Sequence, residues 1–175
     1  MPRCKNCKDK FDPSHFLQKF CFKPECKKVW IETEKAKQWI EEKKERKANL
    51  ETVQELMKKA QKVFNEFIRL RDKKEDCISC GKPNGAEQAG HYFSSGGHKN
   101  VTFNLDNVFG QCIACNMHKH GNLIAYQIGI EKRIGGERLL KLHEEAHKDY
   151  KPTREELRQL IKYYKEKISK LKKNS

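Results

Sequence analysis

The sequence has no long apolar run. No stretch approaches the roughly 18 apolar residues that a membrane-spanning helix needs, and the N-terminal segment MPRCKNCKDKFD lacks the hydrophobic core of a secretory signal. Hydrophobic residues make up only 36% of the 175 residues, so a large core is not expected. We therefore expect a cytoplasmic protein with no membrane partner, whose stability depends partly on something other than apolar burial.

Acidic residues are also scarce. The chain has 24 Asp and Glu against 38 Lys and Arg, which gives a formal net charge of +14. A surface with this excess attracts a polyanion, because its lysines and arginines release the counterions that are condensed around phosphates. Nucleic acid is therefore the expected partner.

Cysteine, in contrast, is plentiful, with eight residues in four close pairs. Because cytoplasmic thiols stay reduced, such pairs indicate metal ligands rather than disulfides. The first two pairs lie within residues 1–27 and consist of Cys4, Cys7, Cys21 and Cys26. A segment this short cannot fold on apolar burial alone, whereas four thiolates on one tetrahedral zinc can supply the missing free energy. We expect a zinc knuckle here.

The other two pairs are Cys77-x2-Cys80 and Cys112-x2-Cys115, separated by 31 residues. This spacing predicts a second structural zinc, because each tight turn contributes two ligands and the four together close the coordination shell. A zinc bound by four thiolates has no open position for water. It is therefore expected to hold the loop between the pairs, and any chemistry must come from other residues of the same block.

The rest of the chain is predicted to be mainly helical. No Pro or Gly interrupts residues 28–71, which we interpret as a charged helix followed by an amphipathic one that begins at the capping box Thr52-x-x-Glu55. A second capping box, Thr153-x-x-Glu156, begins a final basic helix. We divide the chain into a zinc knuckle, a helical linker with a packing helix, a zinc-stapled core and a basic helical region. Their ranges are 1–27, 28–72, 73–135 and 136–175.

Two residues of the zinc-stapled core have the chemistry that phosphodiester hydrolysis requires. That reaction needs a base to activate water and a divalent cation to neutralise charge on the phosphate. His91 titrates near neutral pH and can take the proton, while Asn116 offers a hard carbonyl oxygen suited to Mg²⁺. Because Asn116 directly follows Cys115, the zinc site itself would fix its position. His98 and His120 lie in the same neighbourhood and can substitute in either role.

The same block resembles a known family. The strings AGHY, QC-x2-CN-x-HK-x-GNL and RIG are similar to those of the lambdoid phage NinG (Rap) recombination proteins. The wider pattern is similar to zinc-stapled HNH nucleases, including the endonuclease VII type of Holliday-junction resolvase. The resemblance spans most of the chain and is specific between Cys77 and Leu123. It implies a small zinc-stabilised α+β fold, in which a ββα-metal (HNH) core is joined to an N-terminal zinc knuckle and long flanking helices.

The resemblance implies a Mg²⁺-dependent endonuclease, encoded by a phage or prophage, that acts in the bacterial host cell on branched DNA such as Holliday junctions and D-loops. His91 would be the general base, Asn107 would tie the loop between two strands, and Asn116 would bind the metal. His118 would be a further ligand or a phosphate contact. The acidic metal ligand that often stands beside the base is absent here, so either Glu87 serves as that ligand or the first ligand is missing.

Four basic residues are expected to contact nucleic acid: Lys119, Arg158, Lys162 and Lys165. Lys119 follows the Asn-x-His motif, and the other three lie on the final helix. A plain surface lysine and a solvated basic face explain the same residues without any contact.

Two alternatives stay open at the level of the whole protein. A non-catalytic zinc-ribbon adaptor that binds DNA or RNA accounts for the charge and the cysteines, but not for the positions of His91 and Asn116. Symmetric cleavage of a junction requires two active sites, so a homodimer is an attractive arrangement.

Overall fold

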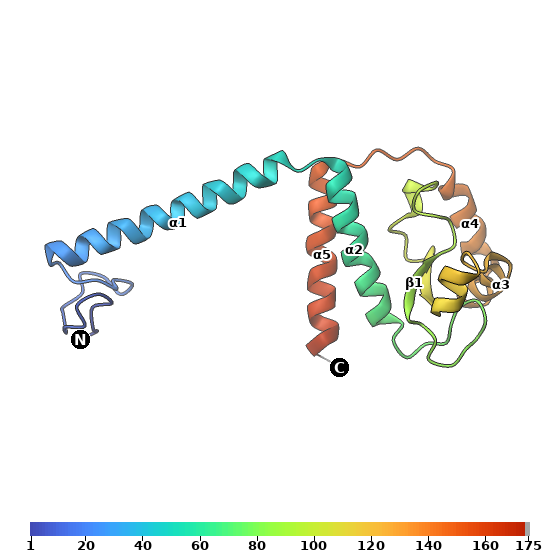
Figure 1. Cartoon of the computed structure of the whole chain (residues 1–175), viewed down its shortest axis with the longest axis horizontal. Coiled ribbons are helices and arrows are strands. Elements are labelled where there is room, and N and C mark those ends of the chain that lie inside the picture. The colour runs from blue at the N-terminus through green and yellow to red at the C-terminus, as the bar shows by residue number, and fades with distance from the viewer. Residues whose placement is uncertain (174–175) are drawn as a thin grey trace. The chain divides into compact units, whose positions relative to one another are not determined.

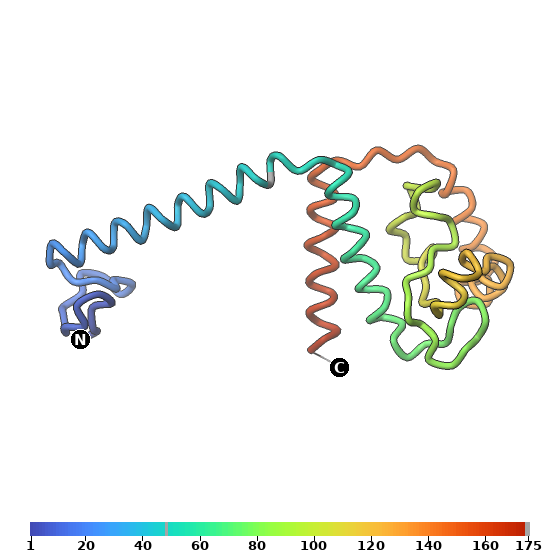
Figure 2. Tube along the Cα trace, in the orientation of Figure 1, coloured from blue at the N-terminus to red at the C-terminus, as the bar shows by residue number. Residues whose placement is uncertain are grey.

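The computed structural model describes residues 1–173, apart from the side chain of Ala48, and the chain forms two compact units. The first is Met1–Glu51, and the second begins at Thr52. Within the described residues both units are mainly helical (Figures 1 and 2). A two-stranded sheet lies in the second unit. The predicted mixed α+β class is confirmed at this level. None of the described helices has the length and apolarity needed to cross a membrane.

The first unit consists of a cysteine-bearing loop, residues 1–23, and helix α1 (Pro24–Leu50). Pro24 occupies the start of the helix, where its missing N–H needs no partner, and Glu25 in the first turn complements the helix dipole. Among the described side chains of α1, only Cys26 is buried. The loop therefore anchors α1 through its first turn, and the unit provides no core for the rest of the helix.

Two parallel helices, α2 (Val53–Arg71) and α5 (Arg154–Lys173), lie side by side in the second unit (Figure 1). Each begins at the capping box that the sequence predicts, in which a threonine hydroxyl accepts a hydrogen bond at 3.2 Å from the backbone N–H three residues later. Phe64 of α2 and Tyr164 of α5 meet edge to face, with ring centroids 4.9 Å apart. Phe64 is completely buried, so it belongs to the core between α2 and α5.

The sheet pairs β1 (Gln88–His91) with β2 (Val108–Gln111) in antiparallel register, with His91 opposite Val108. The α2 helix is fastened to this sheet by Asp72, which is almost completely buried. The Asp72 carboxylate accepts a hydrogen bond from the backbone N–H of Gly110 at 2.8 Å and pairs with the neighbouring guanidinium of Arg71 at 2.6 Å.

Four further helical elements belong to the second unit, and one of them, α3 (Leu123–Ile134), is hydrogen-bonded to both strands. The Tyr126 hydroxyl donates to the Gly90 carbonyl at 2.9 Å and accepts from the Phe109 N–H at 3.0 Å, so this helix is locked across β1 and β2. The helix carrying Tyr126 is α3. The four helical elements are the 3₁₀-helix η1 (Lys99–Val101), the π-helix η2 (Ala114–His118), α3 (Leu123–Ile134) and α4 (Gly136–Ala146).

Candidate metal centres and a histidine and asparagine cavity

The N-terminal cysteines come together as one tetrad. The sulfurs of Cys4, Cys7, Cys21 and Cys26 all lie within 4.8 Å of one another, and Cys7 Sγ and Cys21 Sγ are 3.7 Å apart. A disulfide would bring two sulfurs to about 2.0 Å, whereas tetrahedral zinc with bonds of about 2.3 Å separates them by about 3.8 Å. The sulfur spacing therefore fits a metal-binding tetrad.

The second tetrad has the same geometry. The sulfurs of Cys77, Cys80, Cys112 and Cys115 lie within 4.8 Å of one another, with Cys80 Sγ and Cys112 Sγ 3.8 Å apart. Backbone and side-chain N–H groups point at the sulfurs, as thiolates require: the Cys112 N–H donates to Cys77 Sγ at 3.3 Å, and Asn122 Nδ2 donates to Cys115 Sγ at 3.4 Å.

The surroundings of two thiols of the second tetrad show why it needs a cation. Burial raises the pKa of Cys77, but hydrogen bonds led by the Cys112 backbone N–H outweigh it and lower the pKa to about 7. Burial raises the pKa of Cys115, helped by the neighbouring thiols, to about 12. Four crowded thiols cannot all ionise together unless a cation offsets their charges. The predicted grouping into two tetrads that can hold structural metal ions is confirmed, and zinc suits both.

A cavity of about 670 Å³ opens beside the second tetrad, within the second unit. Its walls come from α2, from β1 and the loop that follows it, from the end of the π-helix region and from the start of α3. The side chains in this lining that can bind a metal or exchange a proton include those of Gln61, Asn65, His91, His98, Asn116 and His120. Sequence positions as distant as 61 and 120 thus converge on one site.

His91 ends strand β1, and its environment favours the neutral imidazole. Its Nε2 lies 3.3 Å from the Thr102 carbonyl oxygen, to which it donates when protonated. That tautomer leaves Nδ1 without a proton, as a base requires. Burial lowers the pKa of His91 below its ordinary value of 6.5, against the smaller opposing effect of the Thr102 and Ala89 carbonyls.

Asn116 reaches the cavity from the π-helix that carries the last zinc ligand. The backbone N–H of Asn116 donates to the Cys112 carbonyl at 3.0 Å, which ties the residue to a cysteine of the second tetrad. The side chain is half-buried. A π-turn at this point is a feature often found at functional sites.

Asn107 is wholly buried and lies outside the cavity lining. Its amide donates to the Phe93 and Val101 carbonyls, both at 3.0 Å, and its Oδ1 accepts from the Phe93 N–H at 2.8 Å. These bonds tie together the two ends of the loop between β1 and β2. Asn107 therefore positions the strand that ends in His91 and does not itself face a substrate.

Besides Asn107, two more of the expected site residues are not among those that line the cavity. Glu87 is exposed, and its carboxylate accepts from the Ile113 N–H at 3.1 Å and lies 3.9 Å from Lys82 Nζ, so it stabilises the turn before the π-helix. His118 is also exposed and does not line the cavity. The neighbouring His120 lines it instead.

The residues expected to contact nucleic acid are all on the surface or partly exposed. Lys119 is exposed after the π-helix. Arg158, Lys162 and Lys165 line one surface hollow on α5, at the spacing of successive helical turns.

Asn65 was not identified from the sequence. Its Oδ1 is buried and has no hydrogen-bond partner in the described part of the chain, yet the residue lines the cavity. A buried carbonyl oxygen without a partner is costly, which indicates that a ligand, water or ion completes it. The one available signal was a polar residue beside the apolar stripe of α2, and that is too common to single it out.

Comparisons with known proteins agree with the sequence pattern. The family model described as Bacteriophage Lambda NinG protein matches residues 1–174. This chain belongs to that family. It is 34% identical to Protein ninG of Escherichia phage lambda and to Protein ninG of Salmonella phage P22, each over 97% of this chain and 93% of the relative. Protein ninG of Escherichia phage 933W is 32% identical over the same shares. No solved structure matches the chain.

Proposed function

We propose that this protein is a metal-dependent endonuclease that cleaves branched DNA intermediates in phage recombination. The observation that carries the proposal is the single cavity that contains both His91 and Asn116, next to a cysteine tetrad. A base and a hard oxygen ligand in one cavity are the minimum set for phosphodiester hydrolysis.

His91 acts as the general base. Its Nε2–H is directed at the Thr102 carbonyl, and its Nδ1 is the atom that takes the proton from water. Because burial lowers the pKa of His91, the imidazole is neutral and ready to accept that proton at physiological pH.

Mg²⁺ is the proposed catalytic cation, and the amide oxygens of Asn116 and Asn65 would hold it. The unpartnered Asn65 Oδ1 is the structural feature that fits such a ligand. The cation would neutralise charge on the scissile phosphate. No carboxylate is among the cavity's lining residues, so substrate phosphate oxygens and water, both of which Mg²⁺ accepts readily, would supply the remaining ligands.

The rim of the cavity favours a branch point over an intact duplex. Leu123 and Ile124 line it and are 50% and 83% exposed. Apolar side chains of this kind insert between or against base faces that have lost a neighbour, as bases at a branch have. The basic hollow of Arg158, Lys162 and Lys165 provides a phosphate-contacting surface on α5.

The test compares cleavage of a labelled four-way junction with cleavage of a linear duplex of the same sequence, using zinc-loaded protein with and without Mg²⁺. The proposal predicts nicks near the branch, only with Mg²⁺, and much slower cleavage of the duplex. Tight junction binding without any cleavage would favour the alternative, a non-catalytic zinc-ribbon adaptor.

A further inference from the structure

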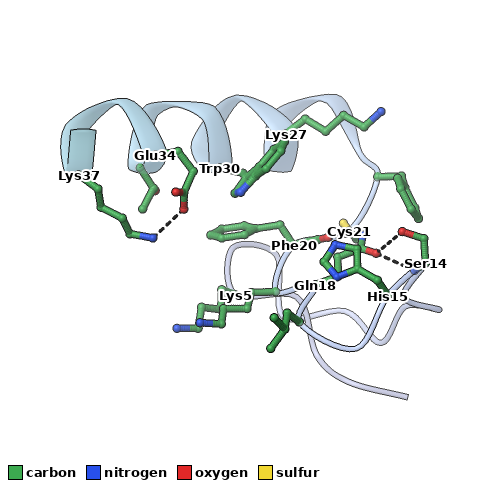
Figure 3. Close-up of a pocket in the computed structure, with 14 residues that line it drawn as sticks. Lys5, Ser14, His15, Gln18, Phe20, Cys21, Lys27, Trp30, Glu34 and Lys37 are labelled. Atoms are coloured by element: carbon green, nitrogen blue, oxygen red, sulfur yellow. Dashed lines mark hydrogen bonds and ion pairs between the residues drawn. The ribbon is translucent and has the colours of Figure 1, made fainter. Parts of the chain in front are cut away.

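The first unit contains a cavity of its own, of about 480 Å³, between the cysteine loop and the first turns of α1. Figure 3 shows Trp30 on the α1 wall and Phe20 on the loop wall, with Lys5 and Lys27 at the edges. Phe22 also lines the cavity. Aromatic and basic side chains thus line one hollow.

The first tetrad holds both walls of this cavity. Cys21 lines the cavity between Phe20 and Phe22, while Cys26 anchors the helix that carries Trp30. Phe20 packs against the buried cysteine cluster. With its metal bound, the cavity is therefore already formed before any ligand arrives, which reduces the entropy cost of binding.

The aromatic rings are open to a ligand. Trp30 is 49% exposed and Phe22 is 55% exposed, although both are large and apolar. Exposed rings that line a preformed hollow mark a binding site more often than scattered surface residues do. Lys27 Nζ lies over the Phe22 ring, 5.7 Å from its centroid, so a flat, unsaturated group can use Trp30 and the part of Phe22 that Lys27 leaves exposed.

The net charge of the residues that line the cavity is positive. Four lysines line it, and the single carboxylate, Glu34, already pairs with Lys37 at 2.6 Å. The backbone N–H of Lys5 donates to the Lys19 carbonyl at 2.9 Å, so these two residues are held side by side. Neither Lys5 nor Lys19 forms an ion pair with any described residue. Their ammonium groups are available for an anion.

We propose that this cavity binds single-stranded nucleic acid, with a base stacked on Trp30 and Phe22 and the backbone phosphates beside Lys5 and Lys19. A flat π-system joined to a phosphate matches the aromatic walls and the positive edge, and this combination is typical of sites that bind single strands without reading sequence. A paired duplex cannot offer a base face to such a hollow. The site belongs to the first unit and does not depend on the nuclease proposal.

Tryptophan fluorescence reads this cavity directly, because the chain has only two tryptophans, Trp30 and Trp39. Trp39 is on the same helix and is 60% exposed, but it does not line the cavity. A Trp39→Phe variant leaves Trp30 as the reporter, and a Trp30→Phe variant leaves Trp39 as the matched control. Both variants are prepared as zinc-loaded full chains that also carry His91→Ala, and the titrations contain no Mg²⁺. The measured binding then does not depend on whether the protein can cleave DNA.

Titration with a short oligothymidylate should strongly quench the fluorescence of Trp30 and hardly change that of Trp39. The matching duplex should quench Trp30 fluorescence much less than the single strand does. Phe22→Ala should lower the affinity measured through Trp30 fluorescence by about tenfold, which is the scale of one base–aromatic stack. Lys5→Ala with Lys19→Ala should lower the slope of log affinity against log salt by about 1.4, or about 0.7 for each phosphate contact. Lys28→Ala with Lys35→Ala, which removes the same charge from outside the cavity, should leave that slope unchanged.

Each of the following would overturn the proposal: equal quenching of the two tryptophans, equal quenching of Trp30 by single strand and duplex, or unchanged binding in the Phe22→Ala variant with its zinc content intact. A blue shift of Trp30 emission with protein concentration alone would also overturn it, because the cavity would then be an interface between copies of this chain.

Discussion

At the scale of single residues, Asn107 and Asn116 occupy opposite environments although they lie close together in sequence. Asn107 is fully buried with three hydrogen bonds to backbone groups. Asn116 is half-buried at a cavity wall, and its side chain forms no hydrogen bond with any described residue. One side chain therefore contributes to the fold and the other to the site.

Asn107→Ala should lower the free energy of unfolding by about 2–3 kcal/mol, because buried backbone groups of Phe93 and Val101 lose their partners. Asn116→Ala should change stability by less than about 0.5 kcal/mol but should strongly reduce cleavage. Urea unfolding and junction cleavage measure the two effects. The account fails if Asn116→Ala is the less stable variant.

Asn65 allows the proposed cation site to be tested by a gain of affinity. Replacing its unpartnered amide oxygen with a carboxylate, in Asn65→Asp, should lower the Mg²⁺ concentration for half-maximal cleavage roughly tenfold, because charged oxygen ligands bind Mg²⁺ more tightly. Gln61→Glu places the same charge on the same cavity wall as a comparison. An equal effect from both variants would show general electrostatic attraction rather than ligation by Asn65.

At the scale of elements, the parallel pair α2 and α5 supports the site, since α2 also forms a cavity wall. Two adjacent tyrosines of α5 differ in their environment, because one packs in the core and the other lies on the surface. Tyr164 is 7% exposed and contacts the rings of Phe64 and Phe67, whereas Tyr163 is 51% exposed.

Tyr164→Ala should therefore cost about 3 kcal/mol of stability, as large-to-small aromatic changes in a core do. Tyr163→Ala should cost less than about 1 kcal/mol. Thermal or urea unfolding of the second unit measures both. Equal losses would mean that α5 does not pack on α2 through this face.

The sequence predicted these elements unevenly, for physical reasons. Capping boxes are local, so the starts of α2 and α5 could be located from Thr52 and Thr153. The parallel pairing of these helices is a long-range choice that neither helix's own pattern encodes. For the same reason, the sequence indicated His91, which lies between two recognisable cysteine pairs, and Asn116, which follows the second pair. It did not indicate Asn65, which the packing of α2 brings to the cavity.

At the scale of the whole molecule, each compact unit contains one cysteine tetrad. The zinc-loaded protein should therefore contain two ions per chain. Cys26→Ser should lose one ion and unfold the first unit only, while Cys115→Ser should lose the other ion and the order of the second. Zinc analysis together with proteolysis measures this, because an unfolded unit is cleaved first. Loss of both ions from either single variant would contradict two independent centres.

The central claim is that His91 activates water for cleavage. The most direct test is single-turnover junction cleavage with Mg²⁺ across a range of pH, for wild type, His91→Ala and His118→Ala at saturating protein. His91→Ala should be slower by about 10²–10⁴-fold with junction binding retained, and His118→Ala, whose side chain lies outside the cavity, should lose far less. The base must be neutral to work, so the wild-type rate should rise with pH through a pKa below 6.5 and then level off. Cleavage by His91→Ala within a few-fold of wild type would contradict the account.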